Sequence, residues 1–293
     1  MELLIAFSLT FRFSLYEFFQ SKKIIQQLKR LAGQDLRLSI NELRVIVALE
    51  RAVARIELNV QLAEHLIFKG GLVLLKSYRS GRFTRDVDAL ALSISKAELS
   101  SLLSLALEVD LDDGLWFGDI QTREIQEQGR YGAYRFDCAF QIGDVGDTKI
   151  RKLPRIHIDI GFSDRLADTP AKQNMPSLLM HETPVSWRIY PMEYVVAEKL
   201  EILIQRGSSN SRAKDVYDLA FLIPLCLDEK KLRDAIMKTF QNRDTSLPPS
   251  LVKAVEDLDV TVLKTAWPSV RVFDNKPEFD SVWAVLLSFL KKL

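Results

Sequence analysis

The sequence predicts an α/β protein with a helical C-terminal region. Strand-like apolar alternation occurs in the run VDALALSI and at about 120–126, 131–141 and 155–162. Segments with apolar residues at helical spacing precede and separate these runs. Beyond Leu227 the pattern predicts three further helices, at about 229–242, 249–257 and 277–291. All the strands are therefore expected before the helical C-terminal region.

Residues 1–35 are interpreted as an N-terminal extension followed by a helix. The opening MELLIAFSLTFRFSLYEFF is apolar and aromatic, but Glu2 occupies the region that is positive in a signal peptide, and Arg12 and Glu17 interrupt the apolar run. We therefore expect a docking segment or a partly disordered extension, with no membrane partner. From Ser21 the apolar spacing predicts an amphipathic helix that ends near Gly33.

A second helix is expected from about Ile40 to Ile56. Ser39 has the side chain of an N-cap, and Glu42, three residues later, completes a capping box. Arg51 and Arg55 lie four residues apart on one face of this helix. We expect solvated salt bridges there, and contact with substrate is the alternative.

A helix from Ser95 to Leu107 is followed by the acidic turn VDLDDG. Asp110, Asp112 and Asp113 superficially suggest a calcium loop, but neither its twelve-residue spacing nor its closing glutamate is present. The turn is therefore interpreted as a solvated loop.

The stretch from Lys69 to Asp88 contains the first candidate chemistry. Lys69, Gly70 and Gly71 follow the apolar residues LIF and precede the helical run LVLLKSY. Glycines at a helix start let backbone N–H groups approach an anion closely, and the helix dipole and a lysine add to the attraction. The pattern indicates a phosphate cradle, and a tight turn into a buried helix is the alternative.

Asp86 and Asp88 form a DxD pair at the start of a predicted strand. Side chains two residues apart in a strand share a face, so the two carboxylates are expected to form a site for Mg²⁺, which prefers hard oxygen ligands. An isolated DxD pair is weak evidence, because such pairs also occur on solvated loops and strand edges. Arg82 and Thr84 precede the pair at the same period of two, so one strand face could present all four residues.

The run RIHIDIG predicts a third acid. Its isoleucines alternate with His157 and Asp159, which places those two side chains on the opposite face. Asp159 is a candidate active-site carboxylate, and a buried aspartate held by backbone donors is the alternative. His157 is interpreted as structural, since phosphoryl transfer does not require a histidine.

A second set of candidates lies in two helices near residues 191–224. The first is expected from Pro191 to about Arg206, with Glu198, Lys199 and Glu201 on its polar parts and Gly207 as its C-cap. The second is the run RAKDVYDLAFLI, which Ser211 could cap and which stops at Pro224.

Arg212 and Lys214 at the start of the second helix are unfavourable for its dipole and need an anionic partner, for which a triphosphate is suited. Asp215 is expected to orient one of these cations, and Asp218 is a further candidate for that role. The alternative is an ion-pair cluster that ties helices together.

The composition limits the function further. The 40 basic and 39 acidic residues give a net charge of +1, so any contact with RNA must be local. The local candidate is the connection GDVGDTKIRKLPR, whose basic residues are Lys149, Arg151, Lys152 and Arg155. A solvated face is the alternative there. Cys138 and Cys226 lack metal-ligand spacing and are expected to be reduced thiols of a cytoplasmic protein.

These motifs together resemble a known family. The GG pair, a spacer of about a dozen residues and RxTxDxD resemble the signature of polymerase-beta-like nucleotidyltransferases, and more closely that of the AbiEii-type toxins of toxin–antitoxin and abortive-infection systems. IHIDIGFSD resembles the strand with the family's third carboxylate. The segment YPMEYVVAEKLEILIQRGSSNSRAKDVYDLAFL is similar to a helical motif AEKxxxLxxRGxxNSRxKDxYDL. The resemblance covers about residues 30–225. Gly71, where many relatives have alanine, and Ser163, in place of a glycine, depart from it.

The resemblance implies a mixed-sheet nucleotidyltransferase core at 36–190 and a helical region at 191–293 that completes the active site. It implies transfer of a nucleoside monophosphate from an NTP to a hydroxyl, the 3′ end of tRNA, with two Mg²⁺ ions at Asp86, Asp88 and Asp159. The triphosphate would be bound by Lys69, Gly70, Gly71, Arg82, Thr84, Arg212 and Lys214, with Asp215 as a supporting residue. Lys214 is also a candidate catalytic group, and an antitoxin encoded nearby is the implied partner.

Two alternatives remain open at the level of sequence. The acceptor could be a hydroxyl of a protein or of a small molecule such as an aminoglycoside, with the same metals. A different class of function is a nucleotide-binding or antitoxin-binding module without turnover.

Overall fold

A computed structural model of the chain describes residues 19–33, 37–125, 132–143, 149–162, 166, 169–179, 184–273 and 275–293. They divide into two compact units. The sheet unit comprises the described residues of Met1–Tyr78, Thr84–Ser163 and Ala171–Ile189. The helical unit comprises those of Arg79–Phe83, Asp164–Pro170 and Tyr190–Leu293. The docking segment expected at the N-terminus lies outside the described residues up to residue 18.

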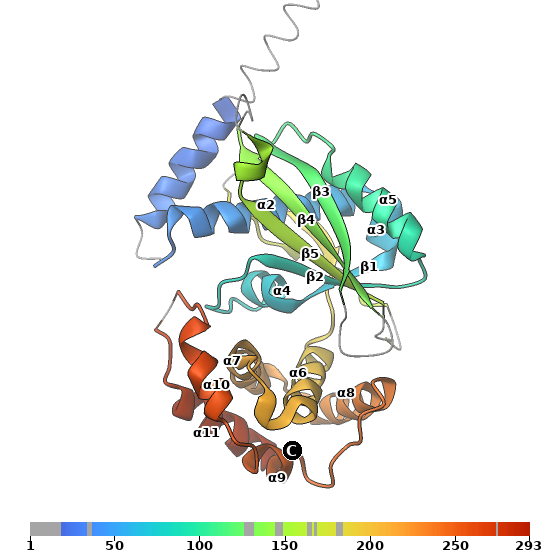
Figure 1. Ribbon diagram of the computed structural model, residues 1–293, viewed down its shortest axis with the longest axis vertical. Helices are drawn as coiled ribbons and strands as arrows, with labels where there is room; N and C mark the ends of the chain where they lie inside the picture. The colour runs from blue at the N-terminus through green and yellow to red at the C-terminus, as the bar shows by residue number, and fades with distance from the viewer. Residues whose placement is uncertain are drawn as a thin grey trace, which may run out of the picture. The chain divides into compact units, whose positions relative to one another are not determined.

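The sheet unit contains a five-stranded mixed sheet (Figure 1). Its strands are β1 (Leu66–Lys69), β2 (Asp86–Ala91), β3 (Leu115–Ile125), β4 (Ala133–Ile142) and β5 (Arg155–Gly161). The spatial order is β1-β2-β5-β4-β3, in which β2 and β5 are parallel and the other neighbours are antiparallel. The prediction of an α/β fold with a mixed sheet and a helical C-terminal region is confirmed.

Helices and a two-stranded sheet complete this unit. Residues 19–32 are helical, and the further helices are α2 (Ile40–Leu58), α3 (Val60–His65), α4 (Gly70–Ser77) and α5 (Lys96–Leu107). Ser39 and Glu42 form the expected capping box at the start of α2. The pair β6 (Lys172–Met175) and β7 (Val185–Arg188) was not expected, because strands of four residues leave little periodicity to detect.

Two expectations about charged residues in this unit are wrong. Arg51, Arg55 and Asp113 are buried rather than solvated. Asp113 accepts hydrogen bonds from Nε of Arg51 at 2.6 Å and from Nη1 and Nη2 of Arg55 at 2.8 and 3.0 Å. A buried guanidinium needs such a partner, since an unpaired buried charge is strongly unfavourable. The turn after α5 is therefore fastened to α2 through its last aspartate, while Asp110 and Asp112 are exposed as expected.

The helical unit contains α6 (Met192–Arg206), α7 (Ala213–Leu222), α8 (Glu229–Asn242), α9 (Leu251–Glu256), α10 (Thr261–Ala266) and α11 (Phe279–Leu290). α6 packs against α7 and α8, and α7 packs against α11. Gly207, with φ of 52°, ends α6 as predicted. Ser211 does not cap α7: Arg212 is the N-cap residue, and its N–H donates to the side chain of Asn210 at 2.8 Å.

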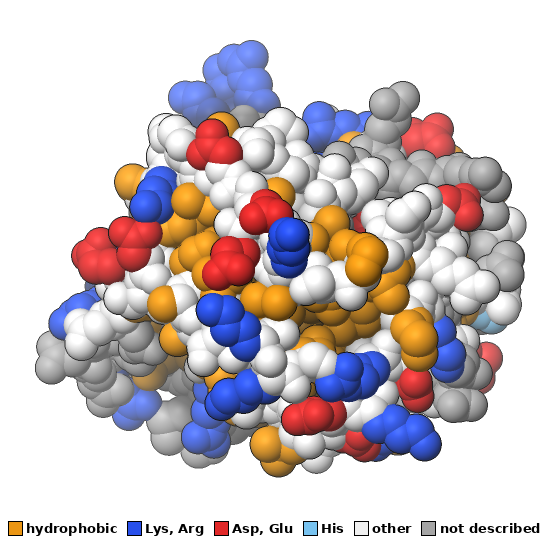
Figure 2. Space-filling view, turned by 90° about the horizontal axis from the view of Figure 1, so that it is seen from below, with side chains coloured by type: hydrophobic (Ala, Val, Ile, Leu, Met, Phe, Trp, Pro, Cys, Tyr) orange, Lys and Arg blue, Asp and Glu red, His pale blue; other side chains and the backbone are white. Residues whose placement is uncertain are grey.

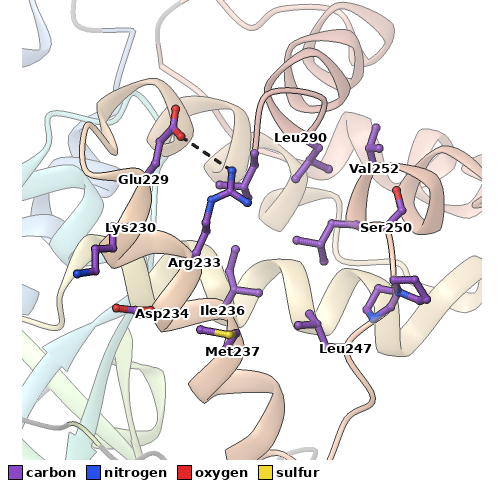
Figure 3. Close-up of a pocket in the computed structure, with 14 residues that line it drawn as sticks. Glu229, Lys230, Arg233, Asp234, Ile236, Met237, Leu247, Ser250, Val252 and Leu290 are labelled. Atoms are coloured by element: carbon purple, nitrogen blue, oxygen red, sulfur yellow. Dashed lines mark ion pairs between the residues drawn. The ribbon is translucent and has the colours of Figure 1, made fainter.

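The helical unit has an apolar groove with a volume of about 780 Å³. Ile236 and Met237 of α8, Leu247 of the following loop and Leu290 of α11 are among the side chains that line it, and Glu229 and Arg233 form an ion pair at its edge (Figure 3). Figure 2 shows hydrophobic side chains gathered between charged ones on one face of the molecule.

Two further observations concern the chain as described. No helix among the described residues combines the length and the apolar character needed to cross a membrane. Cys138 and Cys226 are free and buried, and burial raises the pKa of each thiol to about 12. The expectation that both thiols are free of a disulfide is confirmed.

Candidate functional site

Charged residues form two rows across one face of the five-stranded sheet. The first row consists of Lys69, Asp88, Asp159 and Arg135, which lie opposite one another on β1, β2, β5 and β4. The second, two residues along each strand, consists of Asp86, His157 and Asp137. Because paired residues on neighbouring strands share a face, all seven side chains belong to the same side of the sheet.

The opposite face explains why the sequence forms these strands. Val87, Ile158 and Phe136 alternate with the charged residues, and at most 1% of each is exposed. One face of each strand is therefore buried in the core, and a slip by one residue would bury the acids instead. The apolar periodicity fixes the register, and the register brings together acids that are 71 residues apart in the chain.

In the first row, Arg135 forms a bidentate ion pair with Asp159 through two nitrogens of its guanidinium group. Nε donates to Oδ1 at 2.7 Å and Nη2 to Oδ2 at 2.6 Å. The hydrogen bonds from Arg135 to Asp159 raise the pKa of Arg135, and the charges of Asp86 and Asp88 add to the effect. Arg135 is therefore a cation that offsets the acids of this face, in addition to Lys69 opposite Asp88. Arg135 was not among the residues predicted for the site, because periodicity does not show which strand pairs with β4.

Gly70 and Asp88 are in close contact. Gly70, the first residue of α4, has φ of 73°, and a Cβ at this position would lie 1.9 Å from Oδ2 of Asp88. Both the backbone conformation and the space therefore require glycine. The helix start and the DxD strand, which the sequence offered as separate motifs, thus lie against each other, with Lys69 opposite Asp88 in the register.

In the second row, His157 bridges two carboxylates. Nδ1 lies 3.1 Å from Oδ1 of Asp86, and Nε2 lies 3.2 Å from Oδ2 of Asp137. Asp137 is also bound by Arg155, whose Nη1 donates to Asp119 at 2.7 Å. Arg155, expected in a solvated basic run, is therefore an internal ion-pair partner, whereas Lys149, Arg151 and Lys152 are exposed.

Two expected members of the strand face behave differently. Strand β2 begins at Asp86, so the expectation that residues 82 to 88 form one strand face is wrong. Thr84 is buried, and its Oγ1 accepts the backbone N–H of Asp86 at 3.3 Å. Arg82 belongs to the helical unit, where it binds the fully buried Asp218 through Nε at 2.6 Å and Nη2 at 3.0 Å.

The helical unit contains a buried ion-pair cluster. Lys199 of α6 lies 2.7 Å from Asp215 and 2.8 Å from Asp218, both of α7. Arg212 binds Asp215 at 2.5 Å. Burial alone raises the pKa of Asp218, but Arg82 and Lys199 outweigh it and lower the pKa. Lys199 and Arg212 likewise outweigh burial and hold the pKa of Asp215 well below its usual range. The ion-pair alternative considered for these aspartates therefore describes their observed contacts.

Lys199 was expected on a polar part of α6, but it is enclosed, and so are its neighbours Glu198 and Glu201. Glu201 binds Arg243 at 3.1 Å and Thr245 at 2.5 Å. Sequence periodicity could not show this, because a helix between two others buries polar residues outside its apolar stripe. The spacing of the charged residues did not indicate that Lys199, rather than Arg212, contacts both aspartates.

Lys214 differs from the other cations of this cluster. It is exposed on the first turn of α7. Among the residues that the structure describes, no ion pair or hydrogen bond of its ammonium group is found, whereas Arg82, Lys199 and Arg212 are all paired. Its role as a ligand-facing charge stays a prediction that the exposure supports.

The acids of β2 fit a hard divalent cation. Asp86 and Asp88 supply carboxylate oxygens on one strand face, and Mg²⁺ is commonly held by one or two carboxylates together with substrate phosphates. Asp159 is adjacent to Asp88, but both of its oxygens accept from Arg135. Among the described residues, no group of three or more His, Cys, Asp or Glu side chains is arranged so that it could hold a metal ion. Asp159 as a third ligand therefore stays a prediction.

The fold of this chain resembles that of two solved structures. A structure described as a "putative nucleotidyltransferase from H. pylori" superposes with a TM-score of 0.54 at 15% identity, covering 87% of this chain and 95% of that one. JHP933 from Helicobacter pylori superposes with a TM-score of 0.52 at 16% identity, covering 87% and 92%. At these identities the likeness shows a shared fold.

The family follows from the sequence match. Residues 51–284 match the model of the nucleotidyl transferase AbiEii toxin family, of type IV toxin–antitoxin systems. The chain belongs to this family and is a nucleotidyltransferase, as its motifs predicted. The family implies an antitoxin partner. A comparison with curated proteins gives no match.

Proposed function

We propose that this protein is a toxin that transfers a nucleoside monophosphate from an NTP to a hydroxyl at the 3′ end of tRNA. The observation that carries the proposal is the first row, in which Asp88 lies between Asp159 on one side and Lys69 on the other, with Gly70 against its carboxylate. Acids, a cation and a helix start thus meet at one place on the sheet.

The reaction joins the acceptor oxygen to the α-phosphorus of the NTP. The bond from that phosphorus to the bridging oxygen breaks, pyrophosphate leaves, and the acceptor proton is released. Two Mg²⁺ ions, held by Asp86 and Asp88 with Asp159 as the further ligand, would neutralise phosphate charge and lower the pKa of the acceptor hydroxyl. The protein's own contribution is to hold these acids in register and to fix Asp159 through Arg135.

Cations of the chain would bind the triphosphate. Lys69 and the backbone amides at the start of α4 are proposed as ligands of the triphosphate. Lys214 and Arg212, at the start of α7, are proposed for the same role because of their charge and their position in the helical motif. Arg82 is not proposed as a ligand, because its guanidinium is bound to Asp218 in the interior. Asp215 is proposed to orient Arg212, as their 2.5 Å contact supports.

An RNA acceptor is supported by local charge. Lys149, Arg151 and Lys152 are exposed just before β5, the strand with Asp159. Exposed basic residues contact phosphates without reading sequence, which suits an acceptor shared by many tRNAs. We further propose action in the cytoplasm, where tRNA is the available acceptor, and inhibition by an antitoxin.

The test is transfer of label from each α-³²P-labelled NTP in turn, with Mg²⁺ and total tRNA, resolved on a denaturing gel. We expect label on tRNA with the wild type and a loss of roughly 10³-fold or more with Asp88→Ala. Asp257→Ala, the same change at an exposed aspartate, is the matched control and should retain activity.

Three results would overturn the proposal in different ways. Label on protein would assign a protein hydroxyl as acceptor, and label on an added aminoglycoside would assign a small molecule. No label with any of these acceptors, together with binding of NTP, would support a module without turnover.

A further inference from the structure

His157 makes contacts that the proposed reaction does not use. Its ring lies between the carboxylates of Asp86 on β2 and Asp137 on β4, and each ring nitrogen faces one carboxylate oxygen. The three residues are direct partners in the strand register. The bridge is thus built into the pairing of three strands.

The ring is held at both ends. Asp137 Oδ1 is bound by Nε of Arg155, which leaves Oδ2 for His157 at 3.2 Å. Nη2 of Arg155 also donates to the backbone oxygen of Asp137 at 2.8 Å. Asp137 therefore has little freedom to turn, and its contact fixes the plane of the imidazole. About a third of the side chain of His157 is exposed, so burial alone does not fix it.

The second ring nitrogen of His157, Nδ1, contacts the carboxylate of Asp86 at 3.1 Å. A carboxylate oxygen only accepts hydrogen bonds, so a ring that carries a proton on Nδ1 donates it to Oδ1 and restrains rotation of the carboxylate. Groups that hold a metal ligand in this way typically change metal affinity by about 10–100-fold when they are removed.

We propose that His157 is a positioning residue that orients the carboxylate of Asp86 for a divalent cation, and that Asp137 holds its ring in place. The inference rests on the proposed function, because it requires that Asp86 bind metal. It replaces the interpretation of His157 as merely structural and gives Asp137 a role that the sequence did not indicate.

Two substitutions separate positioning from packing. The amide nitrogen of asparagine is separated from Cβ by the same number of bonds as Nδ1 of histidine. His157→Asn therefore retains a hydrogen-bond donor for Asp86. In glutamine it matches Nε2, so His157→Gln retains the contact with Asp137 and loses the one with Asp86. Mn²⁺, which takes the same oxygen ligands, is titrated into the protein without NTP, and free Mn²⁺ is measured by electron paramagnetic resonance.

We expect His157→Gln to weaken Mn²⁺ binding by about 10–100-fold, and His157→Asn to bind close to wild type. Asp137→Asn alone should weaken Mn²⁺ binding. Combined with His157→Asn, it should cause no further loss of Mn²⁺ affinity, because the asparagine at 157 no longer contacts Asp137. His65→Gln is the matched control: it makes the same change where Nδ1 contacts the backbone oxygen of Leu92 at 2.8 Å, and it should leave binding unchanged.

The outcomes distinguish the two proposals. Wild-type binding of Mn²⁺ with equal binding by His157→Gln would overturn the positioning role alone, and so would equal weakening by the glutamine and asparagine variants. Failure of the wild type to bind Mn²⁺ both without NTP and with a non-hydrolysable NTP analogue would overturn the metal-dependent function itself. Thermal unfolding of each variant shows whether the fold is retained, and Asp137→Asn tests the bridge if His157→Gln does not fold.

Discussion

At the scale of single residues, Gly70 shows how backbone conformation and space act together. A side chain at this position would have an unfavourable left-handed backbone and would collide with the Asp88 carboxylate. We expect Gly70→Ala to lower the free energy of unfolding by about 1–2 kcal/mol from the backbone alone and to reduce transfer activity by displacing Asp88. Urea unfolding and initial rates measure the two effects.

Gly71 provides the matched control. It is helical within α4 and does not have positive φ, so Ala is conformationally compatible there. Gly71→Ala should reduce activity much less than Gly70→Ala. Equal losses from the two substitutions would show that the contact between Gly70 and Asp88 does not decide activity.

Lys199 and Lys214 form a second contrast between residues of one type. Lys199→Met would leave two buried aspartates without a shared cation, and we expect it to cost about 3–5 kcal/mol of unfolding free energy.

Lys214→Ala, at an exposed position, should change stability by less than about 0.5 kcal/mol and raise the KM for NTP by about tenfold or more. A KM unchanged by Lys214→Ala would remove it from the triphosphate site.

At the scale of elements, a buried ion pair fastens the turn after α5 to α2. Arg55 donates to Asp113 and also to the backbone oxygens of Val109 and Leu115, both at 2.9 Å. We expect Asp113→Asn to cost about 3–5 kcal/mol, because two guanidinium groups would remain buried without their carboxylate. Chemical denaturation with circular dichroism measures this cost.

The neighbouring aspartate is the control for this element. Asp112 is exposed with φ of 52°, a conformation that asparagine also tolerates, so Asp112→Asn should change stability by less than about 0.5 kcal/mol. If the two substitutions had the same effect, the turn would not depend on the buried pair.

At the scale of the whole molecule, both units contain aspartates whose pKa is lowered in the folded state. Burial alone raises the pKa of Asp113, Asp215 and Asp218, but their arginine and lysine partners outweigh it. A carboxylate with a lowered folded pKa stabilises the fold above its unfolded pKa, about 3.9, and this contribution is lost as pH falls through the folded value. We therefore expect stability to fall steeply below about pH 4.

Urea unfolding at a series of pH values between 7 and 3 measures this dependence. Glu50 and Glu57 have the opposite sign, because burial raises the pKa of each and outweighs its lysine partner. Their contribution is present below about pH 4.5 and is lost as pH rises through their folded pKa values. Stability at pH 3 equal to that at pH 7 would contradict the prediction for the aspartates.

Much of the fold and part of the site could be predicted from sequence. The capping box at Ser39, the end of α6 at Gly207 and the greater part of each of the strands β2, β3, β4 and β5 follow from local patterns. Short elements such as β6, β7 and α10 did not, since a few residues show too little periodicity. Arg82 was misplaced because the period-two pattern of RxTxDxD extends beyond the strand that begins at Asp86.

The sequence by itself determined which residues can do chemistry: the DxD pair, the third acid, the glycines at a helix start and the helical motif are recognisable by type and spacing. Only the tertiary structure decided what each of them contacts. Arg135 holds Asp159, His157 joins Asp86 to Asp137, and Lys199 lies between two aspartates. The physical reason is that periodicity fixes the face on which a side chain lies, whereas its partner depends on which strand or helix packs beside it.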